Sequence, residues 1–173
     1  MKNNKIRLLL FGSLLVVLVG CDRVSKEIAR EQLKGKPAIS YMHDTFRLDY
    51  TENTGAFLGL GAHLPHFINM LLFRGLPLIV LLLIAAYVIY KRNEMSIFVF
   101  LSFILILAGG FGNVLDRFFF DRHVVDFLNV GIDNLRTGIF NFADFYITTG
   151  VIALLFFYRT KTEKKPVVED DNS

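Results

Sequence analysis

Long apolar segments alternate with polar connections along the whole chain. The apolar segments cover residues 8–21, 67–90, 95–115 and 145–158. A membrane-spanning helix needs ~20 residues to cross a ~30 Å hydrocarbon core, and the second and third segments meet that length as they stand. The first does so if its helix continues to Ala29, and the fourth if residues 141–144 form its first turn. The pattern predicts four transmembrane helices, over about 6–28, 67–90, 95–117 and 141–159.

The composition agrees with a membrane protein. Hydrophobic residues make up 53% of the 173 residues and charged residues only 20%, a more apolar balance than that of a water-soluble domain. We expect residues 1–159 to form a single integral membrane domain. Residues 160–173 are polar and charged, and we expect a disordered cytoplasmic tail there. The single cysteine excludes an intrachain disulfide.

Lysines and arginines predict the direction of insertion. They gather at the start of the chain, at Lys91 and Arg92 between the second and third spans, and from Arg159 onwards. Short loops rich in these residues stay on the cytoplasmic side. We therefore expect both termini to be cytoplasmic and the loops 30–66 and 118–142 to lie outside.

Both outer loops carry strand-like patterns. Residues 45–51 alternate in polarity and predict a short strand, residues 52–55 predict a turn, and residues 56–61 continue beyond it. In the second loop, residues 124–128 are followed by turn signals at Gly131, Asp133, Asn134 and Gly138. We expect a small extracytoplasmic β-sheet element of two or three short strands.

The first 21 residues imitate a bacterial lipoprotein signal. A basic start and an apolar stretch lead to Leu18-Val19-Gly20-Cys21, with small residues before a cysteine. A lipoprotein would continue into a secreted soluble domain, whereas this chain continues into three further apolar segments. We therefore interpret the segment as the first span, with Cys21 packed in it.

Carboxylates and carboxamides lie at the outward-facing ends of the apolar segments. A carboxylate inside a bilayer costs roughly 2.5–3.5 kcal/mol on insertion scales, which makes it a candidate functional group. Asp126 and Asp144 are the candidate catalytic pair, because two carboxyls close together at low dielectric share one proton. The ionised member can take a proton from the water that attacks a peptide carbonyl. The protonated member can donate to that carbonyl or to the leaving amine.

Each of these aspartates also has a plainer interpretation. Asn141 and Asp144 have the spacing of a capping box at a helix start, and Asp126 could be a loop carboxylate paired with Arg122 or Arg136. The dipole of the fourth helix favours a negative charge on Asp144. If the two aspartates do form a pair, we expect Asp144 to be the ionised member and Asp126 the protonated one.

Further polar residues are candidates for supporting this pair or binding substrate. Asn113, Asp116 and Arg117 share one helical face, although the two charges are as readily a structural pair or network. Asp22 and Lys26 have the spacing of a helix-end ion pair, and Asn53 could be a simple turn residue. The full supporting set is Asp22, Lys26, Asn53, Gly55, Asn113, Asp116, Arg117, Asn141 and Ala143.

Other chemistries have less support. His63 and His66 flank Pro65, and no histidine or cysteine spacing resembles a zinc site, so we expect no metal and no cofactor. The basic clusters lack stacking aromatics, which argues against nucleic acid. A proton-coupled transporter would need carboxylates near mid-span. A non-catalytic membrane subunit would tolerate the loss of both carboxylates.

Several separated motifs, in order, resemble the bacterial lipoprotein signal peptidases (signal peptidase II). Residues 22–26 look like the family's Asp-Gln-x-Thr/Ser-Lys, with Arg23 in place of the usual Gln. Residues 53–57 resemble its Asn-x-Gly-Ala-Ala/Phe turn, and residues 109–117 its Gly-x-x-Gly-Asn-x-x-Asp-Arg. Residues 124–127 and 140–144 match its two catalytic motifs. The resemblance covers nearly the whole chain.

This resemblance implies an aspartyl endopeptidase of the bacterial inner membrane. Its substrates would be diacylglyceryl-modified prolipoproteins, cut on the amino side of the lipidated cysteine. It implies Asp126 and Asp144 as the catalytic dyad, with the supporting set around them or in contact with substrate. It also implies membrane lipid as a partner and inhibition by the peptide antibiotic globomycin.

Overall fold

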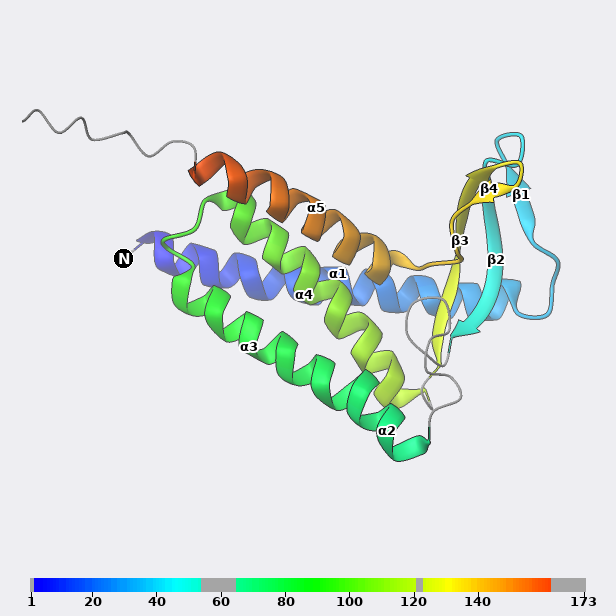
Figure 1. Ribbon diagram of the computed structural model, residues 1–173, viewed down its shortest axis with the longest axis horizontal. Coiled ribbons are helices and arrows are strands. Elements are labelled where there is room, and N and C mark those ends of the chain that lie inside the picture. Colours follow the sequence, from blue (N-terminus) through cyan, green and yellow to red (C-terminus); the bar gives the residue numbers. More distant parts are fainter. Residues whose placement is uncertain (1, 54–64, 121–122, 163–173) are drawn as a thin grey trace, which may run out of the picture.

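Four apolar helical runs and a small sheet make up the described part of the chain. The computed structural model describes residues 2–53, 65–120 and 123–162. The long helices are α1 (Lys2–Leu33), α3 (Leu76–Lys91), α4 (Ile97–Phe119) and α5 (Phe142–Thr162). In Figure 1 they run side by side, and the sheet crosses them at the end away from the N-terminus. The end of α5 and the α3–α4 connection lie at the N-terminal end of the bundle.

Three helices are long and apolar enough to cross a membrane: Lys5–Leu33, Leu71–Lys91 and Ile97–Phe119. A shorter apolar helix, Phe142–Tyr158, is the fourth. All four fall where the sequence predicted spans. Helix α1 extends to Leu33, beyond the expected end at residue 28, and α5 continues to Thr162, past residue 159. Most of the expected tail lies outside the described residues.

The second apolar segment begins irregularly. Helix α2 (His66–Met70) leads into a π-helical turn, η2 (Leu71–Gly75), and then into α3 without a break in helical backbone angles. Pro77 lies in the first turn of α3. A proline ring clashes with the carbonyl four residues earlier in a regular helix, and the widened turn before Pro77 relieves that clash.

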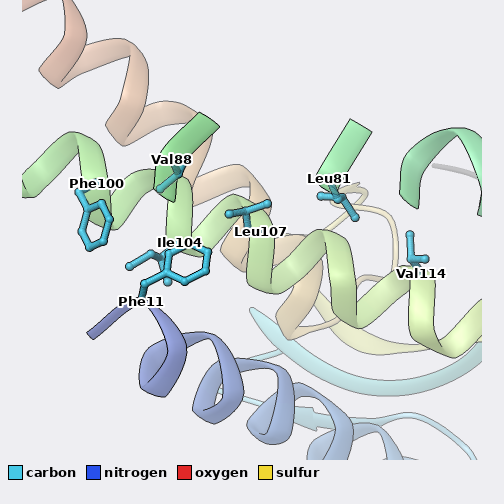
Figure 2. Close-up of a cluster of buried hydrophobic side chains, with 7 residues drawn as sticks. All are labelled: Phe11, Leu81, Val88, Phe100, Ile104, Leu107 and Val114. Atoms are coloured by element: carbon cyan, nitrogen blue, oxygen red, sulfur yellow. The ribbon is translucent and has the colours of Figure 1, made fainter. Parts of the chain in front are cut away.

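The apolar centre of the bundle forms around α4. Figure 2 shows Phe11 of α1 and Leu81 and Val88 of α3 pointing toward side chains of α4. The rings of Phe11 and Phe100 lie 6.3 Å apart. Most other large apolar side chains of α1 and α3 are exposed, as expected for helices whose outer faces contact lipid.

The sheet has four antiparallel strands in the order β1 (Ile39–Tyr41), β2 (Phe46–Asn53), β3 (Val124–Ile132) and β4 (Leu135–Arg136). The predicted strand at 45–51 is thus confirmed, as β2, and the extended segment at 124–128 is the first part of β3. The sheet is larger than the two or three strands expected. Asn53, predicted to lie in a turn, is the last residue of β2 and pairs with Val124 of β3.

The sheet is fixed to the last turns of α1. Ala29 and Leu33 of α1 pack in one buried cluster with Val125, Phe127 and Leu128 of β3. A register shift between Leu48 and Thr51 of β2 places Thr51 opposite Asp126. The extension of α1 beyond the predicted span therefore positions the strand that carries Asp126.

Candidate active site

Asp126 lies within strand β3, with its side chain directed at α5. It is only 4% exposed. The Asn141 side-chain amide donates to Asp126 Oδ1 at 2.6 Å, and the Asn53 side-chain amide donates to Asp126 Oδ2 at 3.3 Å. The alternative of a loop carboxylate paired with Arg136 is not what the structure shows, because Arg136 binds Asn129 and Asp44. Arg122 lies outside the described residues.

Asp144 lies in the first turn of α5 and closes a capping box with Asn141. The backbone N–H of Asp144 donates to Asn141 Oδ1 at 3.0 Å, and the backbone N–H of Asn141 donates to Asp144 Oδ2 at 3.2 Å. This is the reciprocal pattern that the spacing predicted. Asn141 is therefore in contact with both candidate aspartates, and Asp126 and Asp144 come together around it.

Asn113 of α4 supports Asp144 from the other side. Its side-chain amide donates to Asp144 Oδ1 at 2.7 Å, so both oxygens of Asp144 accept a hydrogen bond. The Asn113 carbonyl oxygen accepts from Lys26 Nζ at 3.1 Å. Asn113 thus joins the Asp144 carboxylate to a cation of α1.

A buried cluster of charges lies behind Asn113. Lys26 Nζ donates to Asp22 Oδ2 at 2.7 Å and to Asp116 Oδ2 at 2.6 Å. Lys26 is fully buried, and the two aspartates are nearly so. The other oxygen of Asp22 accepts from the Ala143 backbone N–H at 2.8 Å. The predicted Asp22–Lys26 ion pair is confirmed, and it reaches the residue next to Asp144.

Close contact between α4 and the start of α5 makes these bonds possible. A Cβ added at Gly109 would lie 2.1 Å from the Ala143 carbonyl oxygen, and one at Gly112 would lie 2.7 Å from Asp22 Oδ2. A side chain at Gly109 would force α4 and α5 apart, and one at Gly112 would displace the Asp22 carboxylate. Small residues at a helix contact allow close packing, and these glycines bring the Asp22 carboxylate within reach of the α5 backbone.

Arg117 and Arg23 complete the charged surroundings. Arg117 Nη1 donates to the Asn113 backbone carbonyl at 2.9 Å, and its charge interacts with those of Asp144, Asp126 and Asp116. Asp116 also pairs with Arg23 of α1 at 2.8 Å. In the sequence, Arg23 stood out only as a departure from a motif. Arg23 lies three residues before Lys26, a spacing that places the two side chains on the same side of a helix. That spacing was the sequence feature that could have linked Arg23 to the site.

Asp126 has a strongly perturbed acidity. Burial and, after it, the neighbouring charge of Asp144 together raise the pKa of Asp126 to about 6, against the hydrogen bonds from Asn141 and Asn53. A buried carboxyl beside a second carboxylate keeps its proton to higher pH. The arrangement therefore favours a protonated Asp126, the assignment expected from the helix dipole acting on Asp144.

The described residues contain nearly all of the predicted set. Hydrogen bonds connect the two aspartates to eight of the predicted supporting residues: Asp22, Lys26, Asn53, Asn113, Asp116, Arg117, Asn141 and Ala143. Gly55 lies outside the described residues. Within the described ranges, no group of three or more His, Cys, Asp or Glu side chains could hold a metal ion.

Comparison with known proteins decides the family. The family model described as Signal peptidase (SPase) II matches residues 14–159. The chain belongs to the signal peptidase II family. It is 34% identical over 161 residues to the lipoprotein signal peptidase of Borrelia duttonii (strain Ly), with 90% of this chain and 91% of the relative covered. It is 32% identical over 161 residues to that of Borreliella burgdorferi (strain ZS7), with 87% of this chain and 92% of the relative covered.

Solved structures agree with this placement. A bacterial membrane enzyme determined by the in meso method at 2.3 Å resolution superposes with a TM-score of 0.77 at 25% identity, over 94% of each chain. A second, at 1.9 Å resolution, has a TM-score of 0.72 at 27% identity, over 86% of this chain and 91% of the other. This signal peptidase II family member is thus a protease and a multi-pass membrane protein.

Proposed function

We propose that this signal peptidase II family member is an intramembrane aspartyl endopeptidase whose dyad is Asp126 and Asp144. The single observation that carries the proposal is Asn141, which contacts both aspartates. Two further carboxamides hold the carboxyls: Asn53 donates to Asp126, and Asn113 donates to Asp144. Such supports restrict carboxyl orientation without neutralising the acid and base.

The dyad divides the work of peptide hydrolysis between two protonation states. Ionised Asp144 takes a proton from water as the water oxygen bonds to the scissile carbonyl carbon. Protonated Asp126 donates to the carbonyl oxygen. As the C–N bond breaks, Asp144 gives the proton it took from water to the leaving amine, and Asp126 takes its proton back as the carbonyl re-forms. The raised pKa of Asp126, to about 6, supports this division. NMR titration of each aspartate tests it, and a higher pKa for Asp144 would reverse the roles.

The substrate we propose is a prolipoprotein that carries diacylglycerol on the cysteine after the cut. The relatives named above are lipoprotein signal peptidases. Asp144 lies at the end of an apolar helix, with Phe145 beside it exposed on the outer face. A lipidated cysteine can keep its acyl chains in the bilayer while its peptide bond reaches this level. On the same family grounds we expect globomycin to inhibit the enzyme.

We propose four spans, with both termini in the cytoplasm of a bacterium and the dyad toward the outer leaflet of the inner membrane. Residues 1–159 would form one membrane domain. The N-terminus, the α3–α4 connection and the end of α5 lie at one end of the bundle, opposite the sheet. Lys5, Arg7, Lys91 and Arg92 lie at that end, where the positive-inside rule expects the cytoplasm. Asp126 lies on a strand beyond the helices, which argues against a mid-span proton pathway.

Cleavage of a diacylglyceryl-modified precursor by the purified protein tests this function. We expect Asp126→Asn and Asp144→Asn each to lower the turnover number by at least ~10²-fold, the smallest usual effect of losing a general acid or base. Asp133→Asn is the matched control, because Asp133 is an exposed turn residue with φ of 48°, a conformation that asparagine tolerates. Near-normal turnover by either dyad variant, with thermal unfolding showing an intact fold, would exclude the assignment.

A further inference from the structure

The Asp116 carboxylate binds one cation on each oxygen. Arg23 Nη1 lies 2.8 Å from Asp116 Oδ1, and Lys26 Nζ lies 2.6 Å from Asp116 Oδ2. Lys26 also binds Asp22 at 2.7 Å. Arg23 reaches this buried cluster from its edge: its side chain is 34% exposed, and its guanidinium carbon lies 3.7 Å from the centre of the Phe120 ring.

Arg23 determines the net charge of the cluster. Asp22 and Asp116 contribute two negative charges and Lys26 one positive charge, so these three residues together carry −1. The Arg23 guanidinium brings the sum to zero. Glutamine, the residue that the family resemblance makes usual here, could donate a hydrogen bond to Asp116 but could not cancel this charge. A buried charge without compensation acts over a longer range than one in water.

The cluster is coupled to Asp144 by two short paths. Lys26 donates to Asn113, whose amide donates to Asp144 Oδ1 at 2.7 Å. Asp22 accepts from the backbone N–H of Ala143, the neighbour of Asp144, at 2.8 Å. A net negative charge in the cluster would therefore oppose ionisation of the Asp144 carboxyl.

We propose that Arg23 is a positioning residue that neutralises the buried Asp22–Lys26–Asp116 cluster and so keeps the catalytic base ionised at lower pH. The inference rests on the proposed function of Asp126 and Asp144. It assigns to Arg23 an effect on the acidic limb of the pH–rate profile. Arg23 acts through Asp116 and Lys26 and does not contact the reacting atoms.

The other charged groups around the dyad are the same in the wild type and in the Arg23 variants. The buried or half-buried ones are Arg74 of η2, Arg117 of α4 and Arg30 of α1. Glu52 of β2 and His123 before β3 lie 3.9 Å apart at the sheet. Because these groups remain unchanged, the difference between a variant and the wild type isolates the charge at position 23.

The experiment is the pH profile of kcat for cleavage of a diacylglyceryl-modified precursor by the full chain. Arg23→Gln should cleave the precursor, with its acidic limb moved up by about 0.5–1 pH unit, the size expected for one added buried charge. Arg23→Lys should restore the wild-type limb, because it keeps the positive charge. Glu27→Gln is the control: Glu27 contacts the same guanidinium at 3.4 Å but is 47% exposed, so we expect no measurable displacement of the limb.

A double variant separates charge from packing. Arg23→Gln with Asp116→Asn leaves Asp22 and Lys26, which sum to zero, and its limb should return toward that of the wild type. An unchanged limb in Arg23→Gln, or an equal displacement in Arg23→Lys, would overturn the proposal. If Arg23→Gln does not fold, folding of the double variant supports the charge argument and its failure to fold overturns it.

Failure of the proposed function would look different. Wild-type protein that does not cleave the precursor, or Asp144→Asn that still does, would exclude the dyad itself. Active wild type and inactive Asp144→Asn, combined with an unmoved limb in Arg23→Gln, would exclude only the role of Arg23.

Discussion

Two polar clusters meet at Asn113 and hold their carboxylates by different means. On the α1 side, Asp22 and Asp116 bind the ammonium of Lys26 directly, and Asp116 binds Arg23 as well. On the α5 side, Asp126 and Asp144 accept hydrogen bonds from carboxamides and backbone N–H groups. Both clusters are largely removed from water, so the difference lies in the partners.

The partners determine what each cluster can do. The carboxylates of Asp22 and Asp116 are held in direct ion pairs with a buried ammonium, and the Lys26–Asp116 pair links α1 to α4. Burial and the charge of Asp144 raise the pKa of Asp126 to about 6 despite the hydrogen bonds from its carboxamide partners, so this carboxyl keeps an accessible protonation equilibrium. Asn113 belongs to both clusters, because its side-chain oxygen accepts from Lys26 and its side-chain nitrogen donates to Asp144.

Breaking the charged cluster should have the largest effect on stability. Lys26→Met leaves Asp22 and Asp116 buried, with Arg23 as the one remaining cation of the cluster. Loss of one partner from a buried ion pair costs about 3–5 kcal/mol. We expect a large drop in the thermal midpoint in detergent. Lys34→Met is the control, because Lys34 pairs with Glu52 at 2.6 Å while 59% exposed, and such pairs contribute less than about 1 kcal/mol. Equal losses in the two variants would contradict this contrast.

Neutralising the amide-held cluster should have the opposite sign. Because the pKa of Asp126 is raised to about 6, the folded state binds this proton more tightly than the unfolded chain does. The folded state therefore loses stability as pH rises from about 4 through 6, on the order of 2–3 kcal/mol for the full change. We expect Asp126→Asn to match the wild-type thermal midpoint near pH 4 and to exceed it at pH 7.5. A variant that is less stable at pH 7.5 would refute this sign.

Reversing the polarity of Asn113 should have a smaller effect, on catalysis. Asn113→Asp keeps an oxygen toward Lys26 but replaces the donor to Asp144 with a second acceptor. Losing one hydrogen bond to a charged group costs about 1.5–3 kcal/mol, so we expect kcat to fall roughly 10-fold to 100-fold. The measurement is cleavage at saturating precursor. Turnover equal to that of the wild type would show that Asn113 does not orient Asp144.

Much of the site could be predicted from residues that lie close together in the sequence. The capping box of Asn141 and Asp144 and the Asp22–Lys26 pair each lie within one helical turn, so residue spacing alone predicted them. The apolar segments likewise predicted where the helices lie. These features depend on local geometry, which the sequence encodes directly.

Contacts between elements could not be predicted in the same way. Asp116 was assigned to a pair or network with its neighbour Arg117, whereas its two ion pairs come from α1, 90 and 93 residues away. Asn53 was assigned to a turn, because its role as a strand end depends on pairing with β3. Strands β1 and β4 have three and two residues, too few for a periodic pattern.

The close fit at Gly109 has a consequence for the position of Asp144. With the Ala143 carbonyl oxygen only 2.1 Å from where a methyl group would stand, even Gly109→Ala would push the first turn of α5 away from α4. Asp144 lies in that turn and would move away from the Asn113 amide that donates to it.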